Sequence, residues 1–438
     1  MSEQFSFRAT NGRTLVATMP QLRDSMSDAQ GPIAFLRSPS TIRARARDLL
    51  DLGLAGKLDH FEVRMDALAR VVDRTIAVTR AAYPTLQTPH HSRWNHFGAG
   101  GVDRRADFEK RIAPLSQDER ARARFALAIT SVLLDAGAGP EWRYREPGTG
   151  QVFGRSEGLA VASYHMFVDG LFSSDKKNPY RADADGLERL DGLKLGGAFQ
   201  ASSSNPIVGL EGRADLLGRL GSAMRATPRF FAADADEPPR LGRLFDACRA
   251  RAEDGKLPAR RILFVILEGL GPIWPGRIEL LGVNLGDVWK HSKIGGPTIT
   301  QGLVPLHKLS QWLTYSLIEP LEQAGLTVVG TDELTGLAEY RNGGLFVDDG
   351  VLVPKHADIT KKVHAPSDEV VVEWRGLTVA LLDELAIAMR EKLGKTPGEL
   401  PLSSVLEGGT WTAGRQAARE KREDGTPPIT VDSDGTVF

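Results

Sequence analysis

The spacing of apolar and polar residues along the chain predicts a series of amphipathic helices. The clearest one ends near Arg80, in a stretch where apolar side chains recur every three or four residues. The same pattern, together with helix-start signals, predicts helices over residues 32–54, 61–80, 115–136, 158–171, 210–224, 241–251, 303–324 and 377–393.

Strand signals are few and short. The valine run at 370–374 is the clearest, and residues 280–283 and 326–329 are weaker candidates. Residues 142–153 indicate a hairpin around a Pro-Gly-Thr-Gly turn. The chain is therefore predicted to be mostly α with small β elements.

The length of 438 residues is compatible with two or three domains. The acidic, proline-bearing stretch 232–240 is the best internal break and is expected to be exposed. We predict an N-terminal helical region over 1–150, a helical catalytic region over 151–400 and a docked C-terminal tail over 401–438.

Charge and cysteine content narrow the class of protein. The net charge is −1, so no charge excess points to a nucleic acid polymer or an anionic membrane as partner. The single cysteine, Cys248, cannot form a disulfide framework and fits a reducing cytoplasm. The apolar run at 262–271 is too short to span a bilayer, and residues 1–13 lack a signal-peptide core. We therefore expect a soluble cytoplasmic protein.

Residues 334–352 carry the most unusual combination of side chains. Glu339, Tyr340, Arg341 and Asn342 follow one another among apolar residues. Such groups are costly to bury, so this context indicates either a ligand site or a buried ion pair near a helix end. The residues alone leave the two interpretations about equally open.

Two further segments have features of a small-molecule site. Residues 274–289 place Asp287 between two tryptophans, which suits a flat polar ligand, although a core role for both rings is slightly favoured. Lys308 opens a predicted helix and shares one face with Trp312 and Tyr315. A lysine at a helix start is unfavourable without an anionic partner, which points to a bound phosphate or a structural carboxylate.

The loop at 83–103 contains His90, His91 and His96. Their spacing matches no familiar ligand motif, and no carboxylate follows at a fixed offset, so we predict neither a metal site nor a cofactor. Signatures of serine hydrolases, P-loop proteins, zinc proteases of the HEXXH type and kinases are absent from the sequence.

Three segments, taken in order, resemble the queuosine-salvage N-glycosidases, a mostly helical family akin to the helix-hairpin-helix DNA glycosylases. They are NPIVGLEGRADLLGRLG, then HKLSQWLTYSLIEPL with TDELTGLAEYRNGGLFVDDGVL, and EVVVEWRG, which resembles a strand of that family before its closing helix. The resemblance implies a DNA-glycosylase-like helical architecture. Glu339 stands where that family has Asp, and Asn342-Gly343-Gly344 where it has Val-Pro-Gln, which argues against queuine and for a smaller ureido group.

Nearly the whole chain is similar to the uracil-catabolism protein 4 family of fungi and bacteria. The segments GLAEYRNGGLFVD, HKLSQWLTYS and LEGGTWTAGRQ carry this similarity. It implies a place in a pyrimidine breakdown route that passes through ribosylated intermediates and releases urea. The implied substrate is a small ribosylated molecule, ribosylurea or its 5′-phosphate, and the oligomeric state is left open.

The two resemblances imply roles for individual residues. Glu339 is the expected catalytic acid, which stabilises positive charge on C1′ and O4′ or activates water, and Asp332 is the expected second acid, which orients water or ligand. Lys308 is expected to hold a 5′-phosphate or the ribose, and Arg341 to pair with Glu339 or the phosphate. The other expected substrate-binding residues are Trp312, Tyr340, Asn342 and Asp287. No family acid aligns with Asp348 and Asp349, which are expected in a turn.

Two other functions remain open at this point. A metal-dependent amidohydrolase that opens the pyrimidine ring would contain zinc. A non-catalytic nucleotide-binding protein of the pathway would bind its ligand without turnover.

Overall fold

The computed structural model describes residues 31–232, 237–275, 277–296 and 299–432, together with the backbone of two N-terminal strands. Helices make up most of it, and they pack around one large hydrophobic core that extends from Ala46 to Ile429. The predicted fold class, mostly α with small β elements, is confirmed. The DNA-glycosylase-like architecture and the division at 150 and 400 stay predictions.

The α-helices are α2 (Pro32–Arg37), α3 (Pro39–Leu54), α4 (Leu68–Ala82), α5 (Arg93–His96), α6 (Arg104–Ile112), α7 (Gln117–Leu133), α8 (Arg155–Val168), α9 (Ala184–Glu188), α10 (Gly192–Ala198), α11 (Leu210–Ala226), α12 (Pro228–Phe231), α13 (Leu244–Arg249), α14 (Ala259–Gly269), α15 (Lys308–Gln323), α16 (Tyr340–Asp348), α17 (Asp358–Lys361), α18 (Glu369–Leu393), α19 (Leu402–Val405) and α20 (Trp411–Lys421). Short 3₁₀ turns are η1 (Met65–Ala67), η2 (Ala99–Gly101), η3 (Leu241–Arg243), η4 (Gly271–Ile273) and η5 (Thr331–Glu333), and η6 (Leu406–Thr410) is a π-helical turn.

The strands form small two-stranded sheets. The antiparallel pairs are β1 (Gln4–Arg8) with β2 (Thr14–Thr18), β3 (Phe61–Val63) with β12 (Leu352–Pro354), β4 (Tyr144–Arg145) with β5 (Val152–Phe153), β7 (Glu279–Leu280) with β8 (Val283–Asn284), and β9 (Val288–Lys290) with β10 (Leu303–Pro305). The parallel pairs are β6 (Lys256–Pro258) with β11 (Thr327–Val329), and β13 (Val363–His364) with β14 (Thr430–Val431). The hairpin predicted over 142–153 is confirmed by β4 and β5.

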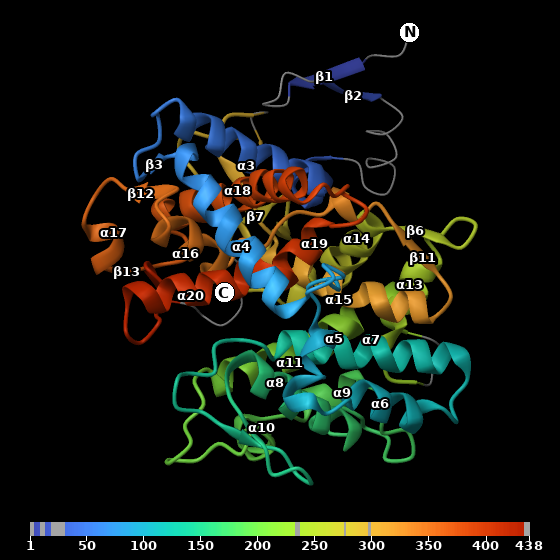
Figure 1. The fold of residues 1–438 in the computed structure, drawn as a ribbon. Coiled ribbons are helices and arrows are strands. Elements are labelled where there is room, and N and C mark those ends of the chain that lie inside the picture. The colour runs from blue at the N-terminus through green and yellow to red at the C-terminus, as the bar shows by residue number, and fades with distance from the viewer. Residues whose placement is uncertain are drawn as a thin grey trace.

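The helices gather in two halves. Figure 1 shows α6 to α11 in one half and the N-terminal and C-terminal helices together in the other. In the second half α18 packs along α3, and α20 packs on α16, so the two ends of the chain share one core. Helix α15 contacts α7 and so joins the halves. No helix in the described ranges is long and apolar enough to cross a membrane.

The predicted strand at 370–374 is wrong, because these residues form the first turns of α18. All of them are buried, and a short, continuously buried apolar run has no periodicity that separates strand from helix. Glu373 accepts hydrogen bonds from the backbone N–H groups of Phe61 (2.9 Å) and His60 (3.2 Å). Tertiary packing therefore outweighs the strand preference of the valines.

The helix predicted from residue 61 begins later, at Leu68, because Phe61 lies in β3 and pairs with Pro354 of β12. Residues 303–305, predicted as the start of a helix, form β10, and that helix begins at Lys308.

The internal break expected at 232–240 lies partly outside the described residues. Within the described part, Arg240 is tied to Glu119 of α7 by an ion pair.

The packing of α20 on α16 leaves no room for a side chain at Gly414. A β-carbon there would lie 2.2 Å from the backbone oxygen of Arg341. We expect Gly414→Ala to lower the free energy of unfolding by about 1–3 kcal/mol, because the two helices must move apart. Urea denaturation would measure this. Gly212→Ala is the control: its β-carbon meets nothing within 4 Å, and alanine is favoured over glycine in a helix, so that variant should be as stable as the parent or more so. An unchanged Gly414→Ala protein would contradict the packing.

Candidate active site

Asp287, the residue before β9, binds the first backbone N–H groups of helix α15. Its backbone carbonyl accepts hydrogen bonds from the N–H groups of Leu306 (3.0 Å) and His307 (3.2 Å), and its side chain accepts one from Lys308 N–H (2.9 Å). His307 has the left-handed φ of 45° that this entry into the helix requires. Asp287 therefore serves as the N-terminal cap of α15 although it is distant in sequence.

The remaining lone pairs of Asp287 are also occupied. Arg375 of α18 binds both carboxylate oxygens, at 2.7 and 2.8 Å, and the indole N–H of Trp289 donates at 2.6 Å. Burial opposes ionisation, but the Arg375 charge and these donors hold the pKa of Asp287 well below its usual range. The structure thus gives Asp287 a structural role, and its predicted contact with substrate stays a prediction.

Glu339 lies at the N-cap of α16, where its two carboxylate oxygens accept hydrogen bonds from the N–H groups of Arg341 (2.8 Å) and Asn342 (2.6 Å). The side chain is almost completely buried, with 8% of the residue exposed. Burial raises the pKa of Glu339, and the two N–H groups and the charge of Lys308 offset this only in part. A carboxyl group whose pKa is raised by burial, beside a cation, is typical of acid–base catalysis.

The ammonium group of Lys308 faces the same site. Burial lowers the pKa of Lys308, and the charge of Glu339 is the strongest influence in the opposite direction. The two groups form no ion pair, and the half-buried Lys308 makes no side-chain hydrogen bond among the residues that the structure describes. A cation that lacks a protein acceptor is suited to a polar or anionic ligand.

The histidine loop lines this site. The ring of His91 stacks on Trp312 of α15, with ring centres 6.0 Å apart, and His96 lies 6.2 Å from the same indole. His91 Nδ1 is 2.7 Å from a carboxylate oxygen of Glu407, in the π-helical turn η6. His91 is also close enough to lower the pKa of Glu339 in part. Burial lowers the pKa of His96 to about 3, so that ring is neutral.

The carboxyl group of Glu407 is ionised in this arrangement. Burial would raise the pKa of Glu407, but the hydrogen bond and charge of His91 lower it below its ordinary value. A carboxylate bound to one imidazole nitrogen orients the ring and stabilises its protonated form. Sequence reasoning did not assign Glu407 a role, although it lies in the LEGGTWTAGRQ segment that carried the family resemblance.

Arg341 has two separate functions. Its backbone N–H binds Glu339, while its guanidinium donates to the carbonyl oxygen of Gly425 at 2.8 Å. Arg415 lies beside it, because Gly414 packs on the Arg341 carbonyl. The Arg415 guanidinium lies over the ring of Trp411, 3.6 Å from its centre, and 3.5 Å from a carboxylate oxygen of Glu157. Burial lowers the pKa of Arg415, and the nearby charge of Arg341 acts in the same direction. The guanidinium groups of Arg341 and Arg415 thus place two positive charges near Tyr340.

The structure does not bring Asp332 to this cluster. It is exposed on η5, and its backbone carbonyl accepts a 3.2 Å hydrogen bond from Arg43. Its catalytic role stays a prediction that no contact in the described residues supports. Asp348 is the last residue of α16 rather than part of a turn, whereas Asp349 lies in the turn that follows, as expected; Asp348 pairs with Arg422 and Asp349 with Arg74.

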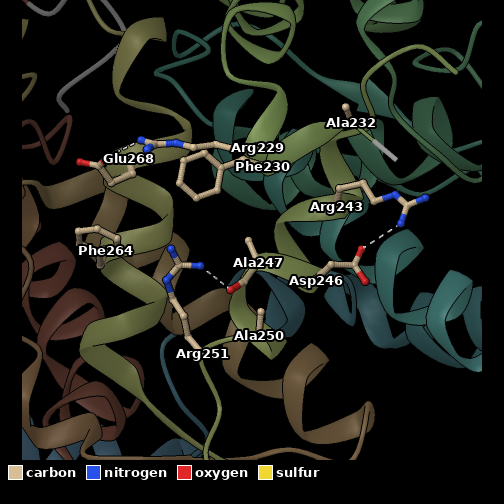
Figure 2. A pocket seen from close by; sticks show the side chains of 10 residues that line it. All are labelled: Arg229, Phe230, Ala232, Arg243, Asp246, Ala247, Ala250, Arg251, Phe264 and Glu268. Carbon is tan, nitrogen blue, oxygen red and sulfur yellow. Dashed lines mark hydrogen bonds and ion pairs between the residues drawn. The ribbon is translucent and has the colours of Figure 1, made fainter. Parts of the chain in front are cut away.

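A cavity of about 410 Å³ lies elsewhere, among α12, α13 and α14 (Figure 2). Its charged groups are satisfied by one another or by the backbone: Arg229 binds Glu268 at 2.8 Å, and Arg251 donates to the Ala247 carbonyl at 2.8 Å. Neither Glu339 nor Lys308 lines it. Glu339 and Lys308, by contrast, form no ion pair with each other among the described residues, and the catalytic role of Glu339 stays a prediction.

The described residues contain no group of three His, Cys, Asp or Glu side chains arranged to hold a metal ion. The candidate site consists of a buried carboxyl group, a lysine and a histidine–carboxylate pair.

Comparison with known proteins identifies the family. Residues 35–438 match the model of a family described as a protein of unknown function, DUF1688. The chain belongs to the DUF1688 family. This family member is 35% identical over 437 residues to the protein of Lachancea kluyveri named Uracil catabolism protein 4, with 93% of this chain and 99% of that one covered.

A second relative supports the same placement. The DUF1688 member is 38% identical over 416 residues to Protein urg3 of Schizosaccharomyces pombe, again with 93% of this chain and 99% of the relative covered. The predicted resemblance to the uracil-catabolism protein 4 family is thus confirmed. The more distant resemblance to queuosine-salvage N-glycosidases stays a prediction.

The raised pKa of Glu339 predicts how stability depends on pH. The folded protein holds this proton more tightly than the unfolded chain, so the contribution of Glu339 to stability is present below the unfolded pKa of about 4.3 and is lost as pH rises from there through the raised folded pKa. We expect Glu339→Gln to be more stable relative to wild type at about pH 7 than at about pH 4. Urea denaturation at both pH values would measure it.

Glu146→Gln is the matched control for this experiment. Burial works against ionisation there, but hydrogen bonds from Arg104 and His165 lower the pKa of Glu146 to about 2. Its carboxylate stabilises the fold above the unfolded pKa. Glu146→Gln should therefore become less stable relative to wild type as pH rises. If the relative stabilities of both variants changed in the same direction with pH, the raised pKa of Glu339 would be contradicted.

Proposed function

We propose that this protein is an N-glycoside hydrolase of uracil catabolism that releases urea from ribosylurea or ribosylurea 5′-phosphate. The name of one relative, Uracil catabolism protein 4, supports the pathway. The buried Glu339 carboxyl group, next to an ammonium group that has no protein acceptor, supports the reaction type and is the observation on which the proposal rests.

Cleavage of an N-ribosidic bond needs negative charge near the sugar and a proton for the leaving nitrogen. As the C1′–N bond breaks, positive charge develops on C1′ and O4′, and the Glu339 carboxylate would stabilise it. Glu339 would also accept a proton from the attacking water, whose oxygen forms the new bond to C1′. The sugar would leave with a hydroxyl group at C1′.

The protonated imidazole of His91 would supply the proton to the ureido nitrogen, so that neutral urea departs. Glu407 would hold that imidazole in place and stabilise its charge. After the reaction one proton is on Glu339 and one is missing from His91, and exchange with solvent restores both. The reaction consumes one water molecule and needs no further reactant.

The anionic end of the substrate would bind near the cations. Lys308 has no protein acceptor and would contact the ribose hydroxyl groups or the 5′-phosphate. Arg415 and Arg341, on the far side of Tyr340, add positive charge that suits a phosphate. A metal-dependent ring opening is not proposed, because the described residues offer no ligand set for it.

Purified protein incubated with ribosylurea 5′-phosphate, and separately with ribosylurea, should release urea, which a coupled urease assay detects. Glu339→Gln should reduce kcat by about 10²- to 10⁴-fold, because the carboxylate is lost while the shape is kept. Glu253→Gln, with an exposed carboxylate paired to Arg261, is the control and should keep full activity. If folded wild-type protein released no urea from either compound, the proposal would be rejected; ligand binding without turnover would instead indicate a non-catalytic role.

Glu407→Gln tests the positioning role of the carboxylate behind His91. We expect kcat to fall by about tenfold or more while KM changes little, because the imidazole loses the carboxylate that holds it in place. Steady-state kinetics would show this. A rise in KM with an unchanged kcat would count against His91 as the proton donor.

A further inference from the structure

The side chain of Gln311 is polar and buried, yet it makes no hydrogen bond within the described chain. It lies on α15 with 0% of its surface exposed, and neither its amide oxygen nor its amide nitrogen has a hydrogen-bond partner within the described chain. Buried polar groups in native proteins are nearly always bonded to protein, water or ligand, so an amide with both ends open calls for an explanation.

The position of Gln311 on α15 places it in the candidate site. Lys308 is three residues earlier and Tyr315 four residues later, so the three residues share one face of the helix. Lys308 influences Glu339, and the Tyr315 hydroxyl donates to the carbonyl of Thr335 at 3.0 Å. Lys308 and Tyr315 thus direct this face of the helix toward residues 335–339, and Gln311 lies between them on it.

Other open polar atoms surround the same segment. The hydroxyl of Thr335, the amide oxygen of Asn342 and the indole N–H of Trp374 are buried without partners. The Asn342 nitrogen is held by the Leu337 carbonyl at 3.2 Å, which leaves its oxygen as the open acceptor. The Trp374 nitrogen adjoins Gly343, at 2.7 Å from the place a β-carbon would occupy. Together the site offers both hydrogen-bond donors and acceptors beside the carboxyl group of Glu339.

We propose that Gln311 is the residue that recognises the neutral ureido group of the substrate, with Asn342 as its partner. A ureido group presents a carbonyl oxygen and N–H groups side by side. The Gln311 nitrogen would donate to that oxygen, its own oxygen would accept from one N–H, and the Asn342 oxygen would accept from another. This inference rests on the proposed function and assigns the specificity of the same site.

The arrangement also explains why a neutral amide, rather than a charged side chain, stands at position 311. A site built to hydrogen-bond a neutral group discriminates strongly against analogues that lack it, because its own buried polar groups are then left unpaired. Ribose 5-phosphate, which lacks the ureido group, should therefore bind more weakly than ribosylurea 5′-phosphate.

Calorimetry on the Glu339→Gln protein, in which turnover should be about 10²- to 10⁴-fold slower, tests the inference. We expect ribosylurea 5′-phosphate to bind at least about tenfold more tightly than ribose 5-phosphate, and the addition of Gln311→Met to abolish that preference while the affinity for ribose 5-phosphate stays the same. Gln323→Met is the matched control: Gln323 is exposed on the same helix and bonded to Glu319, so the preference should remain.

The outcomes separate this inference from the proposed function. Absence of urea release by the wild-type protein rejects the hydrolase, whereas a ureido preference that survives Gln311→Met rejects the role of Gln311. Equal weakening of both ligands would assign Gln311 to general architecture and overturn the inference. Loss of folding would overturn it too, since methionine has nearly the same size and removes no hydrogen bond that the protein itself makes.

Discussion

The buried ion pair between Asp287 and Arg375 is the interaction on which the rest of the site depends. Asp287 caps α15 at Lys308, and Arg375 also donates from Nε to the carbonyl of Ala338, the residue before Glu339. One pair of side chains thus positions the cation and the carboxyl group of the candidate site. Breaking such a pair by removing one partner typically costs about 3–5 kcal/mol, because the other charge is left buried alone.

Several polar groups near that pair are buried in ways that lower the stability of the folded protein. The pKa of Glu339 is raised and that of Lys308 lowered, chiefly by burial, and Gln311 makes no side-chain hydrogen bond in the described chain. Each of these features reduces stability, and together they surround one small region. Local costs of this kind gather where a protein has to bind or transform a ligand, and the large surrounding core supplies the stability that offsets them.

Most of the fold class could be predicted from periodicity, and the exceptions have physical causes. The valine run 370–374 lies inside α18, because burial on all sides removes the alternation that distinguishes a strand from a helix. Phe61 lies in β3 because Glu373, distant in sequence, binds its N–H group. Asp332, expected as the second acid by alignment with a related family, is exposed on η5, whereas Glu339 is buried at the N-cap of α16 and is influenced by the charge of Lys308.

The sequence by itself determined the helical character of the chain, the unusual chemistry of residues 334–352 and the family, because local periodicity and residue type are enough for these conclusions. Only the tertiary structure decided which polar groups share a site. His91, Glu407, Gln311 and Glu339 come from four segments spread between residues 91 and 407, and their meeting depends on packing between distant helices. The tertiary structure also decided that Asp287 is a structural cap, since its partner Arg375 lies 88 residues away along the chain. Neither periodicity nor local composition contains that information, because burial and electrostatic environment arise only when the core is assembled.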